Sequence, residues 1–268
     1  MEIKEHLLKG ANVSFKKTPN TSGEFKAGDL DTIILHYTAG PTKNAINTLT
    51  NPRVKASAHL VVSRDGSVTQ LAPFNLITWH AGQSQYEGRI GFNNYSIGIE
   101  IENDGILQKS GNTYRAWYGA THAEDEVIEA THRNSTSKEF WHTYTQVQIE
   151  TVAEVCRLLV ETYDMKLILG HDEIAPKRKQ DPGPAFPIDR IRNGLLHADR
   201  NMNDAEESLK IMTVDAGKLN IRALPSTTAE QVAKSLQKGQ KVKVLEEKNG
   251  WIKVRVPVEG WVFGQYLK

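Results

Sequence analysis

The segment Tyr95–Glu102, YSIGIEIE, constrains the fold most, because its isoleucines alternate strictly with glycine and glutamate. In a β-strand this places the three isoleucines on one face and Glu100 and Glu102 on the other. A strand with such faces belongs to a sheet that buries its apolar side and leaves two carboxylates on the opposite side.

Other segments show the periods of buried strands and amphipathic helices. Strands are expected at 31–37, at 166–170 and at both ends of 58–72, where Asp65-Gly66 marks a hairpin turn. Helices are expected at 42–49 and 145–163, and the second places Cys156, the single cysteine, on its apolar stripe. Strands interspersed with helices predict an α/β domain with a mixed central β-sheet flanked by helices.

Residues 1–192 are predicted to form this domain, with an insertion at 104–144 that lacks clear periodicity. Such an insertion is either a functional lid or surface decoration. Its three histidines, His122, His132 and His142, are interpreted as packed or solvated loop residues in preference to a second metal site.

Residues 193–212 turn polar and are predicted to be a linker. Residues 213–268 alternate as short half-buried strands do, for example around Val242/Val244, and predict a small all-β barrel.

Composition excludes some partners. The net charge of +1 gives no electrostatic reason to bind nucleic acid, and no run reaches the ~20 apolar residues that span a membrane. The start MEIKEHLLKG has no apolar core of a signal peptide, so we expect a cytoplasmic protein as synthesised, with delivery to the cell wall by lysis or a leaderless route left open. The sequence carries no signal for an oligomeric state.

Three residues stand where a zinc site would place them. His36 and His171 end predicted strands, and Asp181 follows in a proline-rich loop. Catalytic zinc takes three protein ligands and leaves a fourth position for water. Ordinary hydrogen-bonded histidines remain an alternative on spacing alone, and the motifs HExxH, GxSxG and Walker A are absent.

Five blocks follow in chain order: HYTAG at His36, SAHLVVSRDGSVTQLAPF from Ser57, WHAGQSQYEGR from Trp79, NNYSIGIEIEN from Asn93 and GHDEIAPKRKQDPGPAF from Gly170. Together they resemble the type-2 N-acetylmuramoyl-L-alanine amidases, which include the AmpD-type recycling enzymes, the animal peptidoglycan-recognition proteins and some phage lysozymes. The resemblance implies that family's fold and a zinc-dependent hydrolase that cuts between N-acetylmuramic acid and L-alanine.

By position, the resemblance implies that His36, His171 and Asp181 bind one zinc ion. It also implies that Glu100 is the catalytic acid and that Lys179 lies beside the bound carbonyl. Alternation along the strand does not choose between Glu100 and Glu102, so only the resemblance selects Glu100.

Four further residues are predicted to bind substrate. Trp79 and His80 are expected to form a wall of the cleft, and Arg89 and Asn94 to contact carboxylates or sugar. The alternative for Arg89 and Asn94 is a solvated surface position.

The segment from Leu219, with NIRALPST, KGQKVKVLEE, NGWIKV and GWVFGQYL, is similar to bacterial SH3-like domains. Trp251 and Trp261 are expected to line a recognition groove or to belong to the core. The barrel favours an amidase acting on peptidoglycan, with a recycling amidase for soluble anhydro-muropeptides and a non-catalytic peptidoglycan sensor as alternatives.

Overall fold

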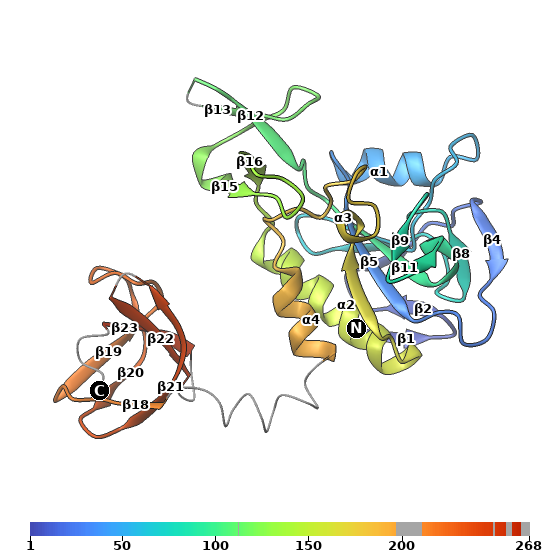
Figure 1. The fold of residues 1–268 in the computed structure, drawn as a ribbon. Coiled ribbons are helices and arrows are strands. Elements are labelled where there is room, and N and C mark those ends of the chain that lie inside the picture. Colours follow the sequence, from blue (N-terminus) through green and yellow to red (C-terminus); the bar gives the residue numbers. More distant parts are fainter. Residues whose placement is uncertain (112, 197–210, 249, 256–258, 264–268) are drawn as a thin grey trace. The chain divides into compact units, whose positions relative to one another are not determined.

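The computed structural model describes residues 1–111, 113–196, 211–248, 250–255 and 259–263 of the 268-residue chain. It divides into two compact units, Met1–His197 and Ala198–Lys268 (Figure 1). Each unit is described by itself.

A six-stranded mixed sheet, in the order β17-β5-β11-β6-β7-β3, forms the centre of the first unit. Its strands are β3 (Val13–Phe15), β5 (Thr32–Tyr37), β6 (Leu60–Val62), β7 (Val68–Gln70), β11 (Ser96–Ile101) and β17 (Leu167–Gly170). β17, β5, β11 and β6 run parallel, whereas β6 and β7 form the antiparallel hairpin expected at the Asp65-Gly66 turn. The predicted mixed sheet is confirmed.

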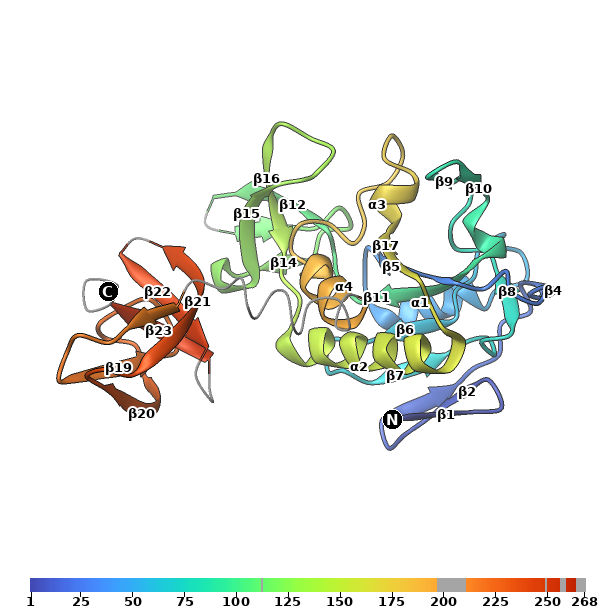
Figure 2. The same ribbon diagram turned by 60° about the horizontal axis from the view of Figure 1, so that its bottom comes forward.

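Helices cover both faces of this sheet. The isoleucines of β11 pack with α2 (Gln146–Tyr163) and α4 (Ile188–Leu196) in the main core, where Cys156 is fully buried. Figure 2 shows α2 lying along the sheet. On the opposite face, α1 (Thr42–Leu49) packs near Val61, and α3 (His171–Ile174) packs near Ile34. Both expected helices form where predicted, and Thr145 caps α2 by accepting a hydrogen bond from the backbone of Gln148.

Short elements complete the unit. The paired strands are β1 (Glu2–Lys4) with β2 (Leu7–Lys9), β4 (Thr21–Glu24) with β8 (Leu76–Thr78), and β9 (Gln85–Tyr86) with β10 (Arg89–Ile90). A 3-10 turn, η1, spans Phe92–Asn94.

The segment 104–144, in which no regular apolar pattern is found, forms a five-stranded antiparallel sheet. Its elements are β12 (Ile106–Ser110), β13 (Thr113–Arg115), β14 (Thr121–His122), η2 (Glu124–Glu126), β15 (Val127–Thr131) and β16 (Lys138–His142). Most of its residues are exposed or half-buried, so apolar alternation is weak.

The second unit is a six-stranded antiparallel sheet in the order β18-β21-β22-β23-β19-β20. The strands are β18 (Ile211–Thr213), β19 (Lys218–Arg222), β20 (Gln231–Gln237), β21 (Lys241–Lys248), β22 (Trp251–Arg255) and β23 (Glu259–Phe263). They enclose a core that includes Val242 and Val254, which confirms the all-β expectation. Trp251 is half-buried, and the side chain of Trp261 lies outside the described residues.

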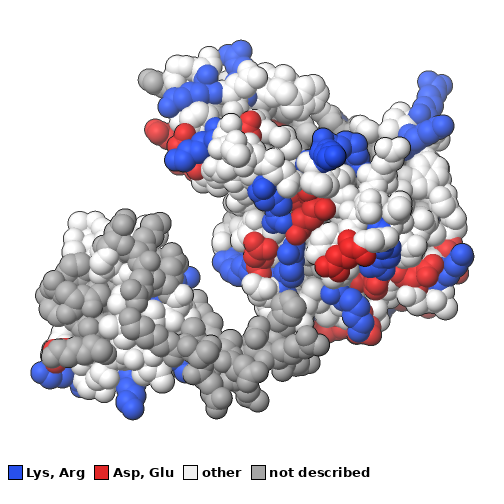
Figure 3. All heavy atoms as spheres, in the orientation of Figure 1, with Lys and Arg blue, Asp and Glu red and all other residues white. Residues whose placement is uncertain are grey.

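Most of the predicted linker, residues 197–210, also lies outside the described residues, while its first residues belong to α4. No described helix has the length and apolarity that a membrane crossing requires. Basic and acidic side chains are interspersed over the visible face of the first unit (Figure 3).

Candidate active site

Two histidines and one aspartate converge at the carboxyl ends of β5 and β17. These adjacent parallel strands bring His36, on β5, beside His171, which directly follows β17. The two Nδ1 atoms lie 2.9 Å apart, and each lies 2.9 Å from Oδ2 of Asp181. All three side chains are buried.

The hydrogen bonds made by the second ring nitrogen, Nε2, of each histidine determine that Nδ1 is the nitrogen available to a metal. Nε2–H of His171 donates to the backbone oxygen of Ala81 at 3.1 Å. Nε2–H of His36 donates to Nδ1 of His80 at 3.0 Å, because Nε2–H of His80 in turn donates to the carbonyl of Ser96 at 3.2 Å. A carbonyl only accepts, so both ligand histidines present unprotonated Nδ1 atoms, as metal-bound histidines do.

The charges of this group also suit a metal. Burial, followed by the neighbouring His171, lowers the pKa of His36 to about 4, so this imidazole is neutral at pH 7. Burial alone would raise the pKa of Asp181, but the two neighbouring histidines outweigh burial and hold that pKa well below its usual range. A neutral imidazole and an ionised carboxylate are the forms that bind zinc, so the group can hold a divalent ion.

Glu100 and Lys179 line the same cleft, which has a volume of about 810 Å³. Glu100 lies opposite His36 in the β5–β11 register. Burial and the negative charge of Asp181 raise the pKa of Glu100 to about 8, although the charge of Lys179 opposes them. A carboxyl that titrates near neutrality beside a metal group is suited to proton transfer.

Glu102, the acid that alternation did not separate from Glu100, has a different place. Its carboxylate accepts hydrogen bonds from the backbone and hydroxyl of Thr42 at 3.1 and 2.8 Å and from the backbone of Arg64 at 2.9 Å. Thr42 is the first residue of α1. Glu102 therefore ties that helix to the β6–β7 hairpin.

The predicted substrate-binding residues separate into two pairs. Trp79 and His80 line the cleft. Arg89 and Asn94 are not among the described residues that line it: Arg89 pairs with Asp31 at 2.8 Å, and Asn94 donates to the carbonyl of Gly91 at 3.3 Å. The structure gives these two residues local structural contacts.

Two residues that the sequence did not single out hold His80 in place. Oδ1 of Asn93 accepts from the backbone N–H of His80 at 3.0 Å and of Ala81 at 2.7 Å. A Cβ on Gly98 would lie 2.4 Å from Cγ of His80, so only glycine allows this close approach. In the sequence, the glycine within the alternating segment YSIGIEIE was the one feature that indicated a close approach of another side chain to this strand.

The insertion supports the ligand loop. His132 donates to Oδ2 of Asp172 at 2.9 Å, next to His171, and stacks on Trp141. Trp141 is 1% exposed and packs so closely on Gly183 that a Cβ there would lie 2.8 Å from its ring.

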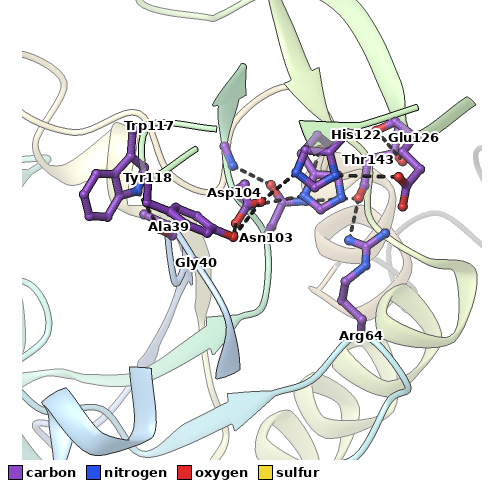
Figure 4. Close-up of polar contacts among 12 residues, drawn as sticks. Ala39, Gly40, Arg64, Asn103, Asp104, Trp117, Tyr118, His122, Glu126 and Thr143 are labelled. Atoms are coloured by element: carbon purple, nitrogen blue, oxygen red, sulfur yellow. Dashed lines mark hydrogen bonds and ion pairs between the residues drawn. The ribbon is translucent and has the colours of Figure 1, made fainter. Parts of the chain in front are cut away.

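A second group, Asp104, His122 and His142, has three possible ligand atoms within 4.8 Å (Figure 4). Here Nδ1 of His142 accepts the backbone N–H of Asp104 at 3.2 Å, so its Nε2 carries the proton of the neutral ring. His122 donates to Asp104 at 2.7 Å. This donor pattern differs from that of His36 and His171, and Nε2 of His142 is buried without a hydrogen-bond partner in the described part of the chain. The interpretation of these histidines as packed residues stays a prediction.

The site combines two histidines and a carboxylate that converge at one edge of a mixed sheet, beside the carboxyl group of Glu100 and in an open cleft. This arrangement is typical of metal-dependent hydrolases. Residues 26–184 match the N-acetylmuramoyl-L-alanine amidase family, and the chain belongs to this family. Residues 217–268 match the bacterial SH3 domain.

Individual relatives agree with this assignment. The 1,6-anhydro-N-acetylmuramyl-L-alanine amidase AmpD of Escherichia coli K12 is 36% identical over 141 residues, covering 52% of this chain and 58% of that protein. The N-acetylmuramoyl-L-alanine amidase AmiD of the same strain is 29% identical over 168 residues, covering 59% of this chain and 51% of AmiD. The chain thus spans between half and two thirds of the length of each. The crystal structure of a selenomethionine AmpD derivative superposes with a TM-score of 0.50 and 27% identity, covering 71% of this chain and 97% of the other.

Proposed function

We propose that this chain hydrolyses the amide bond between N-acetylmuramic acid and L-alanine of peptidoglycan stem peptides, with zinc held by His36, His171 and Asp181. The convergence of two Nδ1 atoms and Oδ2 at 2.9 Å, beside Glu100, carries this proposal. Membership of the amidase family and the names of both relatives support the same bond as the target.

Zinc bound there would act as a Lewis acid and lower the pKa of water. Glu100 takes a proton from the attacking water and passes it to the nitrogen of L-alanine as the C–N bond breaks, so that this nitrogen leaves as an uncharged amine. The ammonium of Lys179 stabilises the negative charge that develops on the amide oxygen. His80 holds His36 in the tautomer that presents Nδ1.

The bacterial SH3 domain match favours polymeric peptidoglycan as the substrate. The alternative, a soluble anhydro-muropeptide, is favoured by the similarity to AmpD, which is named for an anhydro-sugar substrate. A non-catalytic sensor would have no use for Glu100 and Lys179 beside the ligand group.

Purified sacculi and free anhydro-muropeptide, digested side by side, test both the bond and the substrate. We expect stem peptides with a new N-terminal L-alanine, identified by mass spectrometry, and no release by Glu100→Gln. Cleavage at another bond, or equal release by the variant, would contradict the proposed chemistry. A faster rate on the soluble substrate would select the recycling alternative.

A further inference from the structure

The β13–β14 hairpin of the insertion ends in a tight turn whose two central residues are aromatic. The backbone N–H of Gly119 donates to the carbonyl of Ala116 at 2.9 Å, and Gly119 has φ +97°. Trp117 and Tyr118 therefore occupy the corner of a β-turn, where their side chains project away from the hairpin.

Both aromatic side chains are fixed to the amidase core (Figure 4). The hydroxyl of Tyr118 donates to the carboxylate of Asp104 at 3.0 and 3.1 Å, and this carboxylate is also held by His122. Nε1–H of Trp117 donates to the backbone oxygen of Ala39 at 2.8 Å, in the loop between β5 and α1. The turn is thus held at a defined place on the cleft that His36 also lines.

Trp117 nevertheless remains 78% exposed and lines the cleft together with the metal group. Its indole is fixed at one edge by a hydrogen bond and leaves most of its surface open to solvent. An immobilised aromatic surface at the edge of a cleft loses little further entropy when a ligand covers it. This is the property of a stacking platform rather than of a core residue.

The distribution of charged residues along the cleft indicates which class of ligand Trp117 binds. Among the described lining residues, the lysines and arginine come from a single loop, Lys177–Lys179. The wall made by Trp117, Tyr118 and residues 39–41 contains no charged side chain. A stem peptide carries carboxylates that need cations, whereas a pyranose ring is neutral and presents an apolar face of C–H groups. The aromatic wall therefore suits a sugar.

We propose that Trp117 forms a saccharide subsite, which takes the N-acetylglucosamine ring joined to the muramic acid of the scissile bond. The inference rests on the proposed amidase function and deepens it, because it makes the glycan part of the recognised substrate. Tyr118 and Asp104 act as positioning residues that hold the turn.

Two synthetic substrates test the subsite: N-acetylmuramyl-tripeptide, and the same molecule with N-acetylglucosamine attached. For Trp117→Ala we expect the preference in kcat/KM for the disaccharide to fall about three- to tenfold, the range of single aromatic contacts. The loss should lie in KM and should be larger for the disaccharide than for the monosaccharide. Trp117→Phe should retain part of the preference, because it keeps a ring.

Phe15→Ala is the matched control, since Phe15 is an aromatic residue of the same unit, 49% exposed and not among the cleft-lining residues. Because Trp117 is so exposed, Trp117→Ala should melt as the wild type does. An equal loss on both substrates, or an unchanged preference, would overturn the subsite while leaving the amidase intact.

If the wild type cleaves neither molecule, the proposed function fails. Calorimetric titration of both substrates into wild type and Trp117→Ala then decides the subsite on binding alone: a selective loss of disaccharide affinity supports it, and equal affinities overturn it.

Discussion

Glu102→Ala should destabilise the first unit without abolishing turnover, the reverse of the effect expected at Glu100. The substitution removes an acceptor of three hydrogen bonds, of which two come from backbone N–H groups. Hydrogen bonds to a charged acceptor contribute about 1.5–3 kcal/mol each, but Glu102 is half-buried and water replaces part of the loss. We therefore expect a loss of about 3 kcal/mol in the free energy of unfolding.

For a unit of this size, that loss lowers Tm by about 6–12 °C. Circular dichroism of the full chain measures the shift, with Asp125→Ala as a control for removing an exposed acid and Glu102→Gln as a variant that keeps an acceptor. Release of stem peptide is measured below the lower Tm. An unchanged Tm together with lost turnover would show that Glu102 is the catalytic acid and that the roles of the two glutamates are reversed.

The remaining predictions concern the metal, the acid and the barrel. Elemental analysis of protein purified without chelator should find one zinc per chain, and His171→Ala should lose it while keeping its far-ultraviolet spectrum; an active wild type without metal would refute the assignment. Glu100→Gln should keep zinc but lose orders of magnitude in kcat. In the wild type the pKa of Glu100 is raised from 4.5 to about 8, so between pH 5 and 8 the folded chain holds a proton that the unfolded chain releases, and the free energy of unfolding falls as the pH rises. Metal-free Glu100→Gln lacks this proton, so its stability relative to the metal-free wild type should increase over the same pH range. Parallel pH profiles from denaturant titrations would contradict this. Deleting residues 219–268 should slow digestion of sacculi, by up to ~100-fold if both units engage one polymer, and spare a soluble muropeptide; equal losses on both would indicate a structural role for the barrel.

The sequence predicted the elements whose periodicity comes from a buried face. The alternation around Ile99 and the apolar stripe through Cys156 both arise from packing in one core, so the strand and the helix form where expected. The five-stranded sheet of the insertion was missed because its strands are short and largely solvated, which leaves no period to detect.

The convergence of His36 and His171 was predictable because both lie at the ends of strands that are neighbours in a parallel sheet, whereas the choice of Asp181 as third ligand came from the family resemblance. The contacts around this ligand group were not predictable, since they join distant parts of the chain. Nothing local to Trp117 indicates that its indole reaches Ala39, and nothing local to Glu102 indicates that it binds Thr42. Such contacts depend on the tertiary fold, which can be inferred from a single sequence only where that sequence resembles a known family.

The two halves of the insertion should tolerate evolutionary change very differently. The half with His132 and Trp141 packs beneath the ligand loop, so substitutions there disturb the geometry of Asp181. The β13–β14 hairpin contacts the cleft and Asp104 through Trp117 and Tyr118 at its tip and through His122 of β14, and its other strand positions can change without altering the metal group. Related chains would then diversify at this hairpin while the chemistry of the bond they cut stays constant.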